Sequence, residues 1–370
     1  MAVREDDQLM SWDEVQKFLP PNLDPKTRGI LLGNGASMAI WKRFHYSTLY
    51  EIACDTNRHP HLETSDQEVF GHLDTVNFEA VLSALITAGR VWAAFEKPSH
   101  DIDDIRRSYL RIKNVLIAAV RSVHAPYEKF GQDIKRLMSD ALKEYGYVYT
   151  TNYDLLLYWS IMDQPGEFKD FFWNVDREND RVWFDLGDTD EWRDNVTKVL
   201  YLHGSLHLCK HPEGTFKRMS SESGNILEQF DVQGEAIPLF ISEGRHRDKL
   251  AAIIRNDYLS FSYEKFSKHR GSLVVFGHSL TEQFDQHLID AMRKWRRYDQ
   301  KRLRGRTIRR VIAVSMVPWK DGYDIVLEKT RLRRELGEYY ELHFFNSETH
   351  PLGNPLLSLH EEPPDEEVTV

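Results

Sequence analysis

The stretch RGILLGNGAS, residues 28–37, decides the fold class because a short apolar strand runs there into a glycine turn. Such a turn lets the backbone approach a phosphate closely, and the free N–H groups of the following helix favour an anion. The common dinucleotide fingerprint has a third glycine where this chain has Met38, which argues against a standard dehydrogenase. The turn residues that we expect to contact a nucleotide are Gly33, Gly35, Ala36 and Ser37.

Runs typical of buried strands recur along the chain and alternate with helical patterns. After the first strand, a second strand is predicted that contains the run 147–150 and ends at Thr151 or Asn152, and a third within 198–206 that ends at His203. Further strands are predicted at 234–242, within 271–280 together with a turn, and at 309–316 and 339–345. Helices are predicted at 104–124, 247–269, 281–295 and about 323–336. This alternation predicts an α/β, Rossmann-like fold with a mostly parallel sheet and helices on both faces.

The predicted domain organisation is one nucleotide-binding domain over residues 28–360, after an N-terminal lead-in at 1–27. The block at about 46–145 is mostly helical in pattern and too long for a simple crossover, so it predicts an inserted helical subdomain. The aromatic and acidic stretch at about 165–197 predicts an irregular hairpin insertion. Residues 361–370 are acidic and Pro-rich, which predicts a disordered tail.

Composition excludes several classes of protein. Cys54 and Cys209 are the only cysteines and form no CxxC pair, so no structural zinc module is expected. The net charge of −10 argues against direct binding of nucleic acid. The basic segment 293–310 is either a solvated helix end or a docking strip for an acidic partner or nucleic acid. No apolar run approaches a membrane span and no signal peptide is apparent, so we expect a cytoplasmic protein.

Three later polar motifs also follow predicted strands: TTNYD at 150–154, LHGS at 202–205 and FGHSLTEQFD at 276–285. Because ligands of such sheets bind beyond the carboxyl ends of the strands, we expect these motifs to meet the first glycine turn at one crevice. Their candidate site residues are Thr151, Asn152, Asp154, His203, Gly277 and Ser279.

Each candidate also has a simpler interpretation. Asn152 and Asp154 would merely cap the helix that follows them. A lone histidine such as His203 is more often structural than catalytic, and Asp285 would face solvent.

Taken in this order, the motifs resemble those of the sirtuin family. The matching residues are the turn Gly33-Asn34-Gly35-Ala36-Ser37, the motif Thr150-Thr151-Asn152-Tyr153-Asp154, the pair His203-Gly204 and the late turn Gly277-His278-Ser279. The resemblance covers about residues 28–290. The chain departs from protein-deacylating sirtuins because it lacks their four-cysteine zinc module, and because MAIWKRFHYSTLY, residues 38–50, stands where they have Gly-Ile-Pro-Asp-Phe-Arg.

What remains is similar to the zinc-free, sirtuin-like NAD hydrolases of prokaryotic anti-phage defence, including the Phe-x-Tyr-x-x-Leu-Tyr segment at 44–50. The resemblance implies an NAD+ glycohydrolase (NADase) that cleaves the nicotinamide–ribose bond of NAD, its substrate, and requires no metal. Asn152 would orient a water or the ribose, and His203 would contact the ribose hydroxyls or act as a base. One such subgroup works with a HerA-type hexameric ATPase, which makes that translocase the expected partner.

Two alternatives remain open at this point. The protein could be a nucleotide-sensing module without turnover, or a zinc-free sirtuin relative that transfers ADP-ribose or removes acyl groups from protein. The aromatic residues among charges from Phe168 to Trp192 have the composition of an interface, which predicts a homo-oligomer, unless these rings merely cover the sheet.

Overall fold

A computed structural model describes residues 8–19, 27–44, 49–76, 78–96, 98–187, 189, 196–211, 213–218, 237–241, 246–302, 310–318 and 322–359. The tail predicted at 361–370, Tyr46 of the sirtuin-like segment, Trp192 and residues 303–309 of the basic segment lie outside these ranges. No helix in the described ranges is long and apolar enough to cross a membrane.

The main sheet confirms the predicted α/β, Rossmann-like fold. Within the described residues it has seven strands, all parallel, in the order β12-β11-β10-β1-β2-β6-β3. These strands are β1 (Gly29–Leu32), β2 (Tyr147–Thr150), β3 (Phe168–Lys169), β6 (Thr197–Tyr201), β10 (Leu273–Phe276), β11 (Arg310–Met316) and β12 (Tyr340–Asn346). The chain builds outward from β1 in both directions, so the strand order reverses between β1 and β10, which is where such sheets bind ligands.

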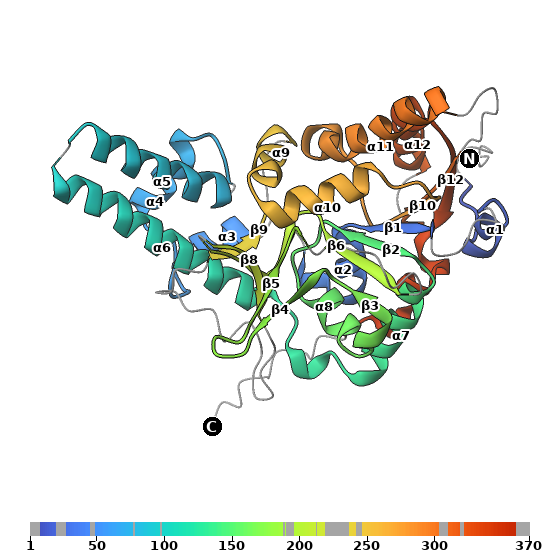
Figure 1. Ribbon diagram of the computed structural model, residues 1–370, viewed down its shortest axis with the longest axis horizontal. Helices are drawn as coiled ribbons and strands as arrows, with labels where there is room; N and C mark the ends of the chain where they lie inside the picture. The colour runs from blue at the N-terminus through green and yellow to red at the C-terminus, as the bar shows by residue number, and fades with distance from the viewer. Residues whose placement is uncertain are drawn as a thin grey trace.

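Helices cover both faces of this sheet, which explains why its central strands are buried along their whole length. In Figure 1 one face carries α10 (Asp257–Ser267), α11 (Glu282–Arg302) and α12 (Gly322–Leu336). The other face carries α2 (Asn34–Ile40), α7 (Gln132–Lys143) and α8 (Leu156–Ile161).

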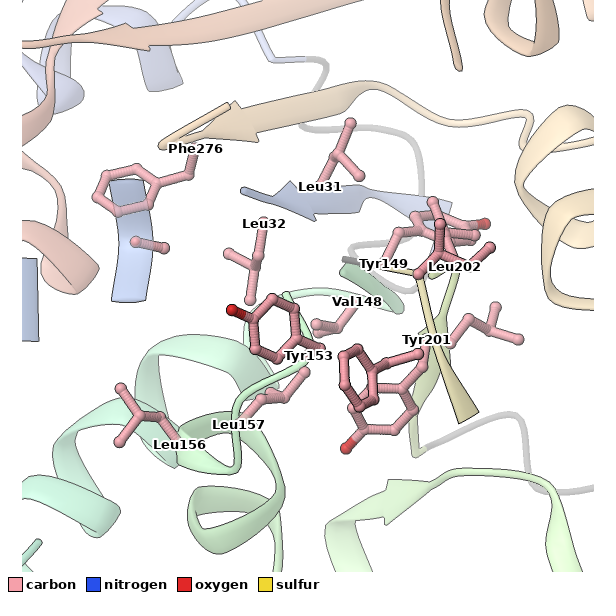
Figure 2. Packing of buried hydrophobic residues seen from close by; sticks show 14 of the residues in the cluster. Leu31, Leu32, Val148, Tyr149, Tyr153, Leu156, Leu157, Tyr201, Leu202 and Phe276 are labelled. Atoms are coloured by element: carbon pink, nitrogen blue, oxygen red, sulfur yellow. The ribbon is translucent and has the colours of Figure 1, made fainter. Parts of the chain in front are cut away.

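Figure 2 shows part of the core, where Leu32 and Val148 of the sheet lie with Tyr153 and Leu157 of the segment that follows β2.

A second, antiparallel sheet was not predicted. Its order is β4-β5-β8-β7-β9, with β4 (Phe172–Asp176), β5 (Arg181–Phe184), β7 (Gly204–His211), β8 (Gly214–Arg218) and β9 (Ile237–Phe240). The strand predicted at 234–242 is therefore present as β9, but it pairs with β7 and not with the parallel sheet. The chain passes from β6 to β7 at Gly204, whose φ of +77° and close approach to the Leu239 carbonyl only glycine tolerates.

The chain between β1 and β2 is helical. It contains η3 (Lys42–Phe44), α3 (Leu49–Cys54), α4 (Thr64–His72), α5 (Phe78–Ala94), α6 (Ser99–Val123), η5 (Tyr127–Lys129) and α7. Helices α5 and α6 form a hairpin, named the arm here, that extends away from the sheets in Figure 1.

Shorter elements complete the fold. The lead-in carries α1 (Trp12–Gln16), and Met10 pairs with Phe345 at the β12 edge of the sheet. The helix predicted at 247–269 is two helices, α9 (His246–Ile254) and α10, because the side chain of Asn256 accepts from the Leu259 N–H and starts a new helix. The remaining turns are η6 (Pro165–Glu167), η8 (Ser347–Thr349), η9 (Pro351–Gly353) and η10 (Pro355–Leu357).

The two glycine turns at the ends of β1 and β10 contact each other directly. The Gly35 N–H donates to the Gly277 carbonyl at 2.7 Å. Gly277 has a φ of +65°, and a Cβ there would lie 2.2 Å from the Ala36 nitrogen. A Cβ on Gly33 would likewise lie 2.5 Å from the Cβ of His278. Side chains at these positions would therefore force the two turns apart.

We predict that Gly277→Ala lowers the free energy of unfolding by about 2 kcal/mol or more, because it adds strain at positive φ to a backbone clash. Gly71→Ala is the matched control. Gly71 lies in helix α4 with open space around it, so alanine should raise stability by about 0.5–1 kcal/mol. Urea unfolding of both variants tests this, and a Gly277→Ala protein as stable as the wild type would contradict the contact.

Candidate functional site at the carboxyl ends of the parallel strands

The structure brings the first two predicted motifs together through the side chain of Asn152. Its Nδ2 donates to the Gly33 carbonyl at 2.9 Å and to Ser37 Oγ at 2.8 Å. Ser37 Oγ in turn donates to Asp154 Oδ2 at 2.5 Å. The Gly33 carbonyl can only accept, so it fixes which end of the Asn152 amide is nitrogen. The turns after β1 and β2 thus form one buried hydrogen-bonded unit.

The amide oxygen of Asn152 points to a ligand. Asn152 is 7% exposed, and its Oδ1 is buried with no hydrogen-bond partner among the described residues. A buried acceptor without a partner costs about 1–3 kcal/mol, so such an atom in a folded protein calls for an explanation. A bound group that donates a hydrogen bond to Oδ1 supplies one.

The helix-capping interpretation describes Asp154 but not Asn152. Asp154 Oδ1 accepts from the Leu156 N–H at 2.9 Å in the first turn of α8. Burial raises the pKa of this carboxyl, while the hydrogen bond from Ser37 acts in the opposite direction. Both Asp154 oxygens are therefore used within the chain, and Thr151 similarly donates its hydroxyl to the Leu32 carbonyl at 3.3 Å.

The glycine turns offer fewer free backbone N–H groups to a ligand than the sequence suggests. The Gly35 N–H, which was expected to face a phosphate, donates to Gly277, and the Ala36 N–H donates to the Gly33 carbonyl at 2.9 Å. Ser279 is exposed, and its carbonyl accepts from Arg331 at 2.6 Å. The close approach of two strand ends is thus one clear reason for the glycines.

His203 lies at the corner between β6 and β7, where it pairs with a histidine that was not predicted. Its Nε2 is 2.9 Å from Nε2 of His287, and the two rings stack with centroids 5.1 Å apart. Burial lowers the pKa of His203 well below its usual value, and burial lowers the pKa of His287 to about 3. Both rings are therefore neutral near pH 7.

The two rings share one hydrogen bond. Two neutral rings joined through their Nε2 atoms need one donor and one acceptor. His287 Nδ1 is buried with no partner among the described residues, so it is an unpaired donor in one tautomer and an unpaired acceptor in the other. Because buried N–H groups without a partner are rarer than buried acceptors without one, we assign the shared proton to His287 Nε2, which leaves the proton of His203 on Nδ1.

Helix α11 supplies the groups that sequence reasoning missed. His287 lies in its first two turns, and its carbonyl accepts from the Tyr263 hydroxyl at 2.8 Å. Asp285, for which a solvent-facing position was the simpler interpretation, is 7% exposed, and its Oδ1 lies 3.6 Å from Lys249 Nζ. Their position in the sequence could have identified both residues, because the first turns of a helix that follows a parallel strand face the ligand crevice. In the described part of the chain, no group of three His, Cys, Asp or Glu side chains could hold a metal ion.

The sheet order and the strand-end cluster define the chain as a Rossmann-like α/β protein with a candidate site at the point where the strand order reverses. A family model described as "Domain of unknown function (DUF4917)" matches residues 30–352. The chain belongs to this DUF4917 family. A comparison with curated proteins finds no match.

The buried histidine pair predicts a pH dependence of stability. Unfolded His287 binds a proton below about pH 6.5, whereas the folded residue does so only near its lowered pKa of about 3. Between these two values only the unfolded state binds the proton, so the free energy of unfolding falls by about 1.4 kcal/mol for each pH unit by which the pH is lowered. Removing the imidazole in His287→Gln should make the pH dependence of unfolding less steep by that amount between pH 5.5 and about 4.5.

Tyr263→Phe is the control, because it removes the hydrogen bond to the His287 carbonyl but no imidazole. The free energy of unfolding of Tyr263→Phe should be lower than that of the wild type by the same amount at pH 5.5 and at about pH 4.5. Equal pH slopes for His287→Gln and the wild type would show that His287 takes up its proton in the folded state.

Proposed function

We propose that this protein is an NAD+ glycohydrolase that releases nicotinamide and ADP-ribose. The observation that carries the proposal is Asn152, which is held rigidly by Gly33 and Ser37 at the strand reversal and keeps one buried amide oxygen without a partner. The sirtuin-like order of the motifs supplies the identity of the ligand. The convergence of Ser37, Asn152 and Asp154 in one buried unit supports that resemblance.

The reaction needs little from the protein. The C1′–N bond breaks, nicotinamide leaves as a neutral molecule, and a water forms the new C1′–O bond and loses one proton to solvent. The transition state resembles an oxocarbenium ion, as in glycoside cleavage. Because the leaving group is already cationic in NAD, no general acid is required.

Two side chains are assigned to this chemistry. Asn152 Oδ1 would accept a hydrogen bond from the attacking water or a ribose hydroxyl and so fix its position. His203 would donate from Nδ1 to the ribose, because its Nε2 lone pair is already used by His287. This assignment favours ribose contact over the role of a base for His203, and it makes His287 a positioning residue.

The same burial supports a regulated enzyme. Asn152 and His203 are 7% and 3% exposed, so NAD reaches them only when the packing around the site opens. A toxic NADase that is closed at rest suits anti-phage defence in the cytoplasm, where a HerA-type hexameric ATPase and self-association would supply the trigger. These partners form part of the proposal.

We predict that Asn152→Ala and His203→Ala each lower NAD turnover by about 100-fold or more, because water placement and ribose orientation act together. Asn152→Ala should also cost about 1–3 kcal/mol of stability, since it removes the two buried hydrogen bonds from Nδ2 to the Gly33 carbonyl and to Ser37 Oγ. Ser37→Ala should raise KM more than it lowers kcat. Release of nicotinamide from NAD by the purified protein, with its candidate ATPase, is the measurement.

Ser205→Ala is the matched control, because this buried hydroxyl donates to the carbonyls of Tyr153 and Asp154 beside the site but has no assigned role. It should lose stability and keep turnover. A chelator should leave the wild-type rate unchanged. A stable, fully active Asn152→Ala protein would remove the assignment, and NAD binding without turnover in the presence of the partner would favour the nucleotide-sensing alternative.

A further inference from the structure

The outer half of the arm has no core of its own. Fully buried side chains end at Leu85 on α5 and begin again at Ile112 on α6, and no described side chain between them is buried. Helix α5 packs chiefly against α6, so the rest of its surface is left to solvent in this part of the arm. Figure 1 shows the two helices reaching away from both sheets.

The uncovered part of the arm is nevertheless apolar. Residues 86–95 read ITAGRVWAAF, with Arg90 as their only charged residue. Val91, Trp92 and Phe95 are 44%, 38% and 73% exposed. A helix that is apolar all round is normally buried, and an exposed apolar patch usually marks a contact surface.

The apolar residues share one face of the arm with an acid and a base. Gly89 of α5 faces Ile105 of α6, where a Cβ would lie 3.8 Å from Ile105 Cγ2. Counted from this pair at about 100° per residue, the side chains on one side of the hairpin are Trp92 and Phe95 from α5 and Asp104 and Arg107 from α6. We name these four residues the distal face.

Helix α4 covers the inner continuation of this same side. Arg111, one turn beyond Arg107, donates from Nη2 to Asp66 of α4 at 2.7 Å. Phe70 of α4 packs edge-on against Phe78 of α5, with ring centroids 5.0 Å apart. The distal face begins where this cover ends.

The charges of the distal face are self-complementary. Asp104 and Arg107 pair with each other along α6, and both are largely exposed, so the pair contributes little to the stability of the single chain. A two-fold axis between them would place Asp104 of each copy against Arg107 of the other. Isologous interfaces have this property, because every contact between two different residues occurs twice, once on each side of the two-fold axis.

We propose that the distal face is a homodimer interface, in which the arms of two copies pack antiparallel with the two Asp104–Arg107 pairs beside the two-fold axis and with Trp92 and Phe95 flanking them. In the stretch predicted as an interface, Phe168 to Trp192, the rings of Phe171, Phe172 and Phe184 are buried within the chain and so cannot contribute to one. The inference does not depend on NAD hydrolysis.

Charge reversal of the full-length protein tests the two-fold arrangement. D104R and R107D each place like charges together at the interface, so each variant alone should dimerise at least about tenfold more weakly than the wild type. An equimolar mixture of the two variants should regain the wild-type affinity, because opposite charges meet again at both pairs. Sedimentation velocity across a wide concentration range measures this.

The apolar residues of the interface are tested separately. Phe95→Glu should weaken dimerisation by about tenfold or more. Leu356→Glu is the matched control at 70% exposure in η10, outside the arm, and should leave it unchanged. A wild-type protein that stays monomeric at all concentrations would overturn the proposal and point to a different protein as the occupant. D104R and R107D dimerising as well as the wild type would overturn it too, and place any dimer on another surface.

Discussion

The rest of the structure depends on the close contact of two backbone turns, the one after β1 and the one after β10. The Gly35 N–H to Gly277 carbonyl bond closes the point where the sheet reverses its strand order. The Gly33 carbonyl then becomes the fixed acceptor that holds Asn152, and Asn152 holds Ser37 against Asp154. Each member orients the next, so a shift of either turn would disturb Asn152, Ser37 and Asp154 together.

Burial governs the electrostatics of this site more than charge does. Desolvation is the largest cause of the pKa shifts of Asp154, His203 and His287, so it raises the pKa of the acid and lowers the pKa values of the bases. The histidine pair of the site is therefore neutral near pH 7. Groups of this kind suit the cleavage of a substrate that carries its own positive charge on the leaving group.

The arm and the site place different demands on the same chain. The site is buried, and two of its atoms, Asn152 Oδ1 and His287 Nδ1, have no partner among the described residues. The outer arm is open and leaves Trp92 and Phe95 in water. Unpaired buried atoms and uncovered apolar side chains are both costly, and these two features support the proposed ligand and the proposed dimer.

The sequence by itself determined the parallel sheet, because strand-length apolar runs that alternate with helices fit a sheet covered on both faces. It also determined that Asn152 and His203 follow strands whose carboxyl ends share one edge. Only the tertiary structure decided that β7 and β9 pair in a second sheet and that His287 pairs with His203. It also decided that Asp154 accepts from the first turn of α8, while Asn152 donates to the turn after β1. Local patterns record which residues are buried, whereas the partners of the Asn152 and His203 side chains lie more than 80 positions away in the chain.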